Sequence, residues 1–303
     1  MKIFRAVRIG AYAATLLCLA VAEYSAKSTD SSDAAGRLRP VHTLTGDIRL
    51  HKDFYSRLLA NSRDVIVYLP PGYDEKRTQR YPVLYMQDGQ NIFDAATSFF
   101  ASGERHMDEE AQELITERAI VPLIIVGVYS IPADRINEFT PSRDPQTNRG
   151  GQADLYGRMM VEELKPLIDE KYRTLRDRDH TVLGGSSLGG LVTMHLGLKY
   201  SAVFGKLTIT SPAAYWADEE IVREVESLPA RTNQRICLSV GTQEPGVFLN
   251  STRDLRQALI RKGWKEGIDL AYMEAPGAQH GPDPHSHRTT QLLTFLFGAK
   301  SKR

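Results

Sequence analysis

Cysteine is nearly absent from this chain, which has only two, Cys18 and Cys237, in 303 residues. An excess of either charge is also missing, because 38 Lys and Arg residues face 37 Asp and Glu residues. A chain with this balance has no electrostatic reason to bind nucleic acid. The hydrophobic fraction of 42% is large enough for a sizeable core, so the composition predicts a soluble globular protein.

Several sequence signatures are missing as well. The chain contains no internal repeat, no coiled-coil heptads, no low-complexity tract and no phosphate-binding loop of the G-x-x-x-x-G-K type. A doubly wound nucleotide-binding domain is the nearest competitor at the level of the fold, but its glycines should follow the first strand. Here the glycine-rich turn follows about the fifth predicted strand, which argues against that reading.

The first 22 residues are typical of a secretory signal peptide. Basic residues precede an apolar run over 9–22 that ends in the small residues Ala-Val-Ala. Because the run is short for a membrane span, we expect cleavage before Glu23 and a periplasmic or secreted protein, with an uncleaved anchor as the alternative. Cleavage also removes Cys18, so Cys237 is expected to be a buried structural thiol without an intramolecular disulfide partner.

The rest of the chain is predicted to form a linker over 23–40 and a single catalytic domain over 41–303. Apolar runs typical of strands occur at 65–68, 83–86, 120–129, 181–183, 207–209, 236–240 and 270–273. Helical patterns lie between or after them, at 107–118, 155–172, 191–198 and 288–297. Strands separated by helical crossovers predict a mostly parallel central sheet covered on both faces, that is, a three-layer α/β fold.

The most informative motif is Gly185-Ser186-Ser187-Leu188-Gly189, a G-x-S-x-G sequence between a predicted strand and a predicted helix. This context is typical of a nucleophile elbow, in which a sharp turn exposes a reactive serine and small residues let the helix approach the strand. Only Ser187 fits the register, because a central Ser186 would put Leu188 where the second glycine belongs. The alternative is a glycine-rich turn with two solvated serines.

A nucleophilic serine needs a base that accepts its proton and a carboxylate that orients the base. His280 follows the last predicted strand in a Gly- and Pro-rich loop, which can deliver an imidazole to the carboxyl edge of the sheet. We therefore favour His280 as the base over His285 and His287. His195 lies within the helix after the elbow, so we expect it to be a packed or surface residue.

Glu244 is the first carboxylate after the predicted strand 236–240, so it is the candidate acid, with Asp254 as the second choice. An oxyanion formed during acyl transfer requires two backbone donors. One is expected from the amide of Leu188, directly after the nucleophile. The other is expected from the amide of Gln90, in the turn that follows the predicted strand 83–86.

Taken together, these residues resemble the putative esterase family of α/β hydrolases, which includes enterobactin, feruloyl and acetylxylan esterases. The resemblance covers about residues 65–297 and rests on the elbow and on Tyr68-Leu69-Pro70-Pro71-Gly72-Tyr73, Leu84-Tyr85-Met86-Gln87-Asp88-Gly89-Gln90-Asn91, Arg135 with Glu138-Phe139-Thr140-Pro141, and Tyr172-Arg173-Thr174. It implies an α/β-hydrolase fold and a cofactor-free serine esterase with Ser187, His280 and Glu244 as catalytic residues and Gln90 and Leu188 as oxyanion donors. The implied substrate is a siderophore, a feruloyl or acetyl carbohydrate, or a simple acyl ester.

The chain departs from the family where a tryptophan often follows the catalytic histidine, since it has Asp283-Pro284-His285 there. Tyr215 and Trp216 resemble a family segment that lines the substrate site, and their rings are expected either to stack on substrate or to belong to the core. We expect no nucleic-acid partner and no stable membrane insertion after signal cleavage.

Two other functions remain open from the sequence. The first is an acyltransferase on the same catalytic residues, in which a second alcohol captures the acyl group. The second is a metal-binding protein that uses the closely spaced His280, Asp283, His285 and His287. That hypothesis leaves the elbow unexplained, so no metal ligand is assigned.

Overall fold

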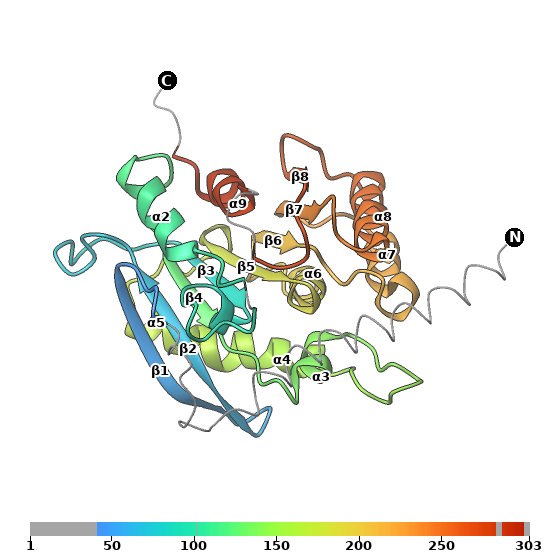
Figure 1. The fold of residues 1–303 in the computed structure, drawn as a ribbon, viewed down its shortest axis with the longest axis horizontal. Coiled ribbons are helices and arrows are strands. Elements are labelled where there is room, and N and C mark those ends of the chain that lie inside the picture. The colour runs from blue at the N-terminus through green and yellow to red at the C-terminus, as the bar shows by residue number, and fades with distance from the viewer. Residues whose placement is uncertain (1–40, 101, 283–286, 300–303) are drawn as a thin grey trace, which may run out of the picture.

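A computed structural model describes residues 41–100, 102–282 and 287–299 (Figure 1). They contain an eight-stranded sheet of order β1-β2-β4-β3-β5-β6-β7-β8. Its strands are β1 (Asp47–Ser56), β2 (Asn61–Leu69), β3 (Val83–Gln87), β4 (Ile124–Val128), β5 (Thr181–Ser186), β6 (Lys206–Thr210), β7 (Arg235–Gly241) and β8 (Leu270–Ala275). β1 pairs with β2 and β2 with β4 in antiparallel fashion, and all other neighbours are parallel. The predicted mostly parallel sheet is confirmed.

Helices cover both faces of this sheet, which completes the three-layer α/β fold (Figure 1). α2 (Met107–Thr116) and α9 (Arg288–Phe297) pack on one face. The other face carries α3 (Arg135–Phe139), α4 (Ala153–Arg158), α5 (Lys165–Lys171), α6 (Leu188–Lys199), α7 (Trp216–Ser227) and α8 (Gly246–Lys262). Successive residues of a central strand therefore enter opposite cores, as Val182 and Leu183 of β5 do, so these strands are continuously apolar.

Two elements differ from the sequence-based expectation. β1 was not predicted, because it is an edge strand in which polar and charged residues interrupt the apolar ones and its pairing is irregular between His51 and Phe54. The predicted helix over 155–172 is divided into α4, the π-helical η2 (Met159–Leu164) and α5. Pro166 lies in the first turn of α5, where its missing N–H is tolerated, so the hydrophobic pattern continues across a change in helix type.

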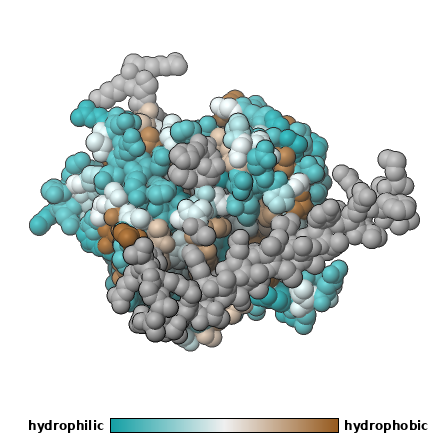
Figure 2. Space-filling view, viewed as in Figure 1, coloured by the Kyte–Doolittle hydropathy of each residue, from teal (hydrophilic) through white to brown (hydrophobic). Residues whose placement is uncertain are grey.

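The remaining predictions about the amino terminus lie outside the described residues. The predicted signal peptide (1–22) and linker (23–40) are in this position, and the extent of the catalytic domain stays a prediction. Among the residues that the structure describes, no helix has both the length and the apolar character needed to span a bilayer. The residues coloured by hydropathy in Figure 2 are mostly hydrophilic, and the apolar ones among them form small separate groups.

Candidate active site

Ser187 lies in the sharp turn between β5 and α6, at the carboxyl edge of the sheet. Its backbone has φ 59° and ψ −124°, a conformation that is strained for any residue with a side chain. Three hydrogen bonds hold this conformation: the Ser187 N–H donates to Thr210 O (3.1 Å), and the Ser187 carbonyl accepts from the amides of Leu191 (3.0 Å) and Ala213 (2.9 Å). The turn has the geometry of a nucleophile elbow.

The glycines of the motif are required by the close approach of β5 and α6. A Cβ atom built on Gly185 would lie 2.3 Å from the carbonyl oxygen of Gly189, which no side chain tolerates. The partly exposed hydroxyl of Ser187 forms no hydrogen bond to another residue in the described parts of the chain. The Ser187 hydroxyl can therefore both donate a hydrogen bond and accept one from a substrate or a base.

Glu244 and His280 are brought together by the loops that follow β7 and β8. The carboxylate Oε2 of Glu244 lies 2.8 Å from Nδ1 of His280. The Glu244 side chain is fully buried, whereas the imidazole is 27% exposed and packs against Phe248 of α8 with ring centroids 4.2 Å apart. Because Nδ1 is used by the carboxylate, Nε2 of His280 is left to exchange a proton with a hydroxyl. Asp254, the second candidate acid, is exposed on α8.

The buried carboxylate of Glu244 has further partners that the sequence did not reveal. Its Oε1 accepts hydrogen bonds from Ser211 Oγ (2.5 Å) and from the amide of Gly241 (2.7 Å), and Arg288 lies 3.4 Å away. Burial alone would raise the pKa of Glu244, but the hydrogen bonds from His280, Ser211 and Gly241 outweigh it and hold the pKa below its ordinary value. Glu244 therefore stays ionised and able to orient His280.

The turn after β3 holds the amide of Gln90 near the start of α6. Gly89 is indispensable there, because a Cβ atom would lie 2.4 Å from the carbonyl carbon of Gly127. The Gln90 side chain fixes the turn by accepting from Ser130 N (3.1 Å) and donating to Ser130 Oγ (2.9 Å). Within the described residues, the backbone N–H groups of Gln90 and Leu188 have no acceptor, so both remain free for an anionic oxygen.

An ion pair neutralises the carboxylate that precedes this turn. Asp88 accepts two hydrogen bonds of 2.7 Å from Nε and Nη2 of Arg135, which is the bidentate geometry of a strong pair. Asp88 also lies against the start of α6, since a Cβ atom on Gly189 would be 3.1 Å from its Oδ2. Arg135 thus prevents an uncompensated negative charge next to the serine.

Tyr215 and Trp216 occupy different environments at the start of α7. The ring of Tyr215 meets Phe248 edge-on at 5.0 Å, and Phe248 in turn contacts His280. Burial raises the pKa of Tyr215 to about 12, so its hydroxyl is neutral. Trp216 is only 8% exposed, and its indole N–H donates to the carbonyl of Ser142 (3.2 Å). Tyr215 therefore lies one ring away from the imidazole, whereas Trp216 packs beneath the 140–150 loop.

The proposed metal cluster near the carboxyl terminus cannot be traced in full, because Asp283 and His285 lie outside the described residues. Of that set, His280 uses Nδ1 for Glu244. A different trio, Glu104, His106 and Glu109 at the start of α2, has ligand atoms within 4.8 Å of one another. A bound metal is not needed to explain why these side chains lie together, because His106 Nδ1 pairs directly with Glu104 at 2.9 Å.

Comparison with known proteins gives the family. Residues 56–275 match the family model described as "Putative esterase". The chain belongs to this family. It is 26% identical over 251 residues to the uncharacterized protein YbbA of Bacillus subtilis (strain 168), covering 79% of this chain and 94% of that one.

Two further likenesses concern proteins with described activities. Iron(III) salmochelin esterase of Escherichia coli O6:H1 is 29% identical over 226 residues, which cover 68% of this chain and about half (49%) of the relative. The crystal structure of an IroE-like serine hydrolase from Shewanella oneidensis superposes with a TM-score of 0.67 at 22% identity, over 83% of this chain and 80% of that one, and so shows the same fold. Family and relatives together make this chain a carboxylic ester hydrolase.

Proposed function

We propose that this family member is a serine esterase in which Ser187 is the nucleophile, His280 the base and Glu244 the acid. The observation that carries the proposal is the 2.8 Å contact between buried Glu244 and His280, at the same sheet edge as a strained elbow serine. The three side chains follow β5, β7 and β8, in the chain order Ser, acid, His of α/β hydrolases.

The proposed reaction begins when Oγ of Ser187 attacks the ester carbonyl and His280 Nε2 accepts its proton. The resulting oxyanion is stabilised by the free amides of Gln90 and Leu188, each worth about 10²- to 10³-fold in rate in comparable sites. Protonated His280 then gives the proton to the departing alcohol. Water, activated by the same imidazole, attacks the acyl-enzyme and releases the acid and free Ser187.

Ionised Glu244 supports both proton transfers because it stabilises the imidazolium and fixes the orientation of the ring. No hydrogen bond joins Ser187 to His280 in the part of the chain that the structure describes. Such bonds are often long in the free enzyme and shorten when substrate binds. The free hydroxyl is therefore compatible with the proposed role.

The substrate is proposed to be a small or carbohydrate-linked carboxylic ester. The salmochelin esterase relative is named for hydrolysis of a siderophore ester, which places siderophores beside feruloyl, acetyl-carbohydrate and simple acyl esters as candidates. The amino-terminal sequence adds the proposal that hydrolysis takes place in the periplasm or outside the cell. Phe248 contacts His280 and Tyr215 contacts Phe248, so the partly exposed ring of Tyr215 is the proposed stacking partner for an aromatic part of the substrate.

A labelling experiment with matched serine variants tests the proposed function. A fluorophosphonate probe should label the wild type and Ser186→Ala but not Ser187→Ala, and turnover of p-nitrophenyl acetate should fall by at least about 10³-fold in Ser187→Ala alone. Persistent labelling or turnover in Ser187→Ala would reject the proposal. Assays with acetylated xylan, feruloyl esters, a catecholate siderophore and simple acyl esters then identify the substrate, and product analysis with an added alcohol separates hydrolysis from acyl transfer.

A further inference from the structure

Arg105 is a partly buried arginine whose guanidinium has no partner among the residues that the structure describes. It lies in the segment that connects the turn after β3 to α2, and its backbone N–H donates to the carbonyl of Asn91 at 3.0 Å. Asn91 directly follows Gln90, so Arg105 is attached to the turn that offers an oxyanion donor. In the described residues, no hydrogen bond or ion pair reaches the guanidinium of Arg105, although such a group carries five donors.

The charged groups around this guanidinium belong to the candidate active site. The pKa of Arg105 is lowered to about 10, because burial and neighbouring Arg288, which lower it, outweigh the carboxylates of Asp88 and Glu244, which raise it. Arg105 is therefore still a cation at neutral pH. Asp88 precedes the oxyanion turn and Glu244 orients His280, so the charges that act on Arg105 are those of the candidate site.

Neither carboxylate uses Arg105 as its counterion. Asp88 is satisfied by two bonds from Arg135, both 2.7 Å long. Glu244 is satisfied by His280, by two hydrogen bonds to Oε1 and by Arg288. Three arginines thus surround two carboxylates in the described part of the site, and Arg105 supplies the uncompensated charge.

Glu104, next to Arg105 in the sequence, does not pair with it either, and the segment that contains Arg105 also reaches the His280 loop. Glu104 is engaged elsewhere, since it accepts from Thr43 Oγ1 (3.2 Å) and lies 2.9 Å from His106 Nδ1. The same segment also touches the loop that carries His280, because a Cβ atom on Gly281 would lie 3.5 Å from the ring of Phe100. The segment that carries Arg105 is therefore attached to the oxyanion turn through Asn91, and Phe100, five residues before Arg105, lies against the loop that carries His280.

We propose that Arg105 binds a carboxylate carried by the substrate, so that the preferred ester has a second, negatively charged group near the scissile bond. This inference rests on the proposed ester hydrolysis at Ser187. A planar guanidinium matches a carboxylate with two parallel hydrogen bonds, and partial removal from water strengthens that pair. An uncharged ester leaves the guanidinium unpaired and gains none of this binding.

Matched pairs of charged and neutral esters test the inference by turnover. In the first pair the charge is on the acyl side, with p-nitrophenyl hemiglutarate against p-nitrophenyl pentanoate. In the second it is on the alcohol side, with 4-acetoxybenzoate against its methyl ester. The wild type should prefer the anionic member of at least one pair, and Arg105→Gln should lower kcat/KM for that member by about 10- to 100-fold while changing the neutral member less than about 3-fold.

Two other variants control for charge and geometry. Arg77→Gln removes the same charge from an exposed position in the loop before β3, at the other edge of the sheet, and should leave both esters unchanged. Arg105→Lys keeps the charge but not the bidentate geometry, and should recover only part of the preference. Equal turnover of charged and neutral esters by the wild type, or an equal loss for both in Arg105→Gln, would overturn the inference.

A binding measurement separates this inference from the proposed function. Monoethyl glutarate should bind the Ser187→Ala variant more weakly, by about 10-fold or more, once Arg105→Gln is added, as calorimetry measures without turnover. Unchanged affinity would refute the role of Arg105 even if Ser187 is the nucleophile. Conversely, reduced affinity supports Arg105 as an anion-binding residue even if labelling of Ser187 fails.

Discussion

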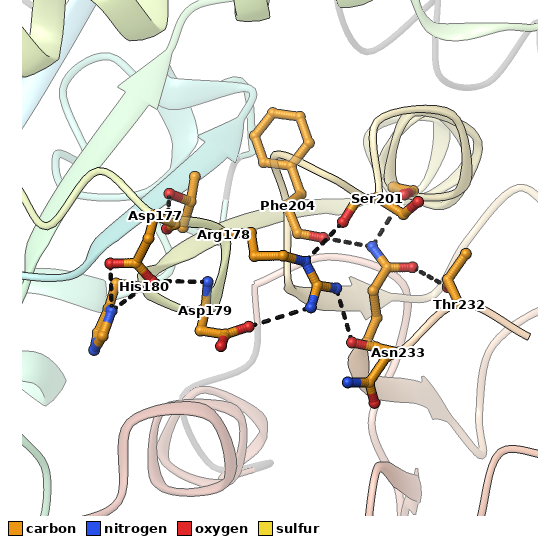
Figure 3. Close-up of polar contacts among 11 residues, drawn as sticks. Asp177, Arg178, Asp179, His180, Ser201, Phe204, Thr232 and Asn233 are labelled. Atoms are coloured by element: carbon orange, nitrogen blue, oxygen red, sulfur yellow. Dashed lines mark hydrogen bonds and ion pairs between the residues drawn. The ribbon is translucent and has the colours of Figure 1, made fainter.

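Two polar regions at opposite edges of the central sheet, one before β5 and one after it, differ in how their groups are paired. At the amino edge, before β5, Arg178 donates to the carbonyls of Ser201 (3.0 Å) and Asn233 (2.8 Å), and Asp177 accepts from Asp179 N (3.1 Å) (Figure 3). At the carboxyl edge, the described structure leaves the hydroxyl of Ser187, two backbone amides and one guanidinium without a partner.

This difference separates groups that stabilise the fold from groups that await a ligand. Buried or partly buried polar groups are nearly always hydrogen-bonded, so a cluster of unpaired ones at a single edge needs an explanation. Open α/β sheets bind ligands at the carboxyl ends of their strands. Buried polar atoms without a partner also occur elsewhere in the described residues, such as Tyr81 Oη and Arg173 Nε. The four groups at the carboxyl end differ from these because they lie together beside the strained backbone of Ser187.

The largest effect on stability is expected at the amino edge, from Gln234. This side chain is 1% exposed and donates to the carbonyls of Gly197 (3.0 Å) and Phe204 (2.5 Å). Gln234→Leu leaves both buried carbonyls unpaired, so it should lower the free energy of unfolding by about 2–4 kcal/mol. The kcat of the protein that remains folded should not change, because Gln234 is remote from Ser187 in the sheet. Urea unfolding and p-nitrophenyl acetate turnover measure the two quantities.

Gln291→Leu is the matched control, since Gln291 is exposed on α9 and its replacement should change stability by less than about 0.5 kcal/mol. A loss of kcat in Gln234→Leu comparable to the loss of stability would show that the two edges are not separate in function.

The fold was largely predictable from local patterns, and its exceptions have physical causes. Central strands such as 181–183 and 236–240 are uniformly apolar because each is buried on both faces, so they are visible in the sequence. β1 lies at the edge of the sheet and has polar residues between its apolar ones, so its sequence did not indicate a buried strand. The π-helical η2 was also not predictable, because a change of helix type preserves the apolar pattern over 159–164.

The candidate site likewise contains residues that were predictable from the sequence and residues that were not. Ser187 was visible because an elbow needs glycines at fixed positions, and Glu244 and His280 because they follow predicted strands. The roles of these residues stay predictions. Ser211, Arg288 and Arg105 lack any such signal, since their places beside Glu244 or the oxyanion turn depend on contacts between segments far apart in sequence.

The next largest effect on stability is expected from the strained backbone of Ser187, at the carboxyl edge of the sheet. Ser187→Gly removes the Cβ atom that makes φ 59°, ψ −124° unfavourable, so it should raise the free energy of unfolding by about 1 kcal/mol while abolishing hydrolysis. Ser186→Gly is the matched control: Ser186 ends β5 without a positive φ, so glycine there should lower stability by about 0.5–1 kcal/mol. Thermal unfolding measures both variants, and the same sign of change in the two would contradict strain at Ser187.

The smallest effect is expected from His195, which lies on α6 and can donate to both of its carboxylate neighbours only when it is charged. Its Nδ1 is 2.9 Å from Glu224 of α7 and its Nε2 is 2.9 Å from Asp154 of α4, so only the imidazolium donates to both carboxylates. Burial alone would lower the pKa of His195, but hydrogen bonds and attraction from Glu224 and Asp154 outweigh it and raise the pKa above its ordinary value. Lys199 also faces this group through its ion pair with Asp154 (2.6 Å).

Because the folded-state pKa of His195 is the higher one, its contribution to stability is complete below the unfolded pKa of about 6.5 and is lost as pH rises through the folded value. His195→Gln should therefore cost on the order of 1 kcal/mol at pH 6 and clearly less at pH 9, measured by urea unfolding at both pH values. His180, at the amino edge, is 45% exposed, and its ion pair in the described structure is with exposed Asp177, so His180→Gln should change stability little at either pH. A cost for His195→Gln that is equal at both pH values would mean that the neutral imidazole packs as well as the charged one, and that the ion pairs joining α4, α6 and α7 contribute no net stability.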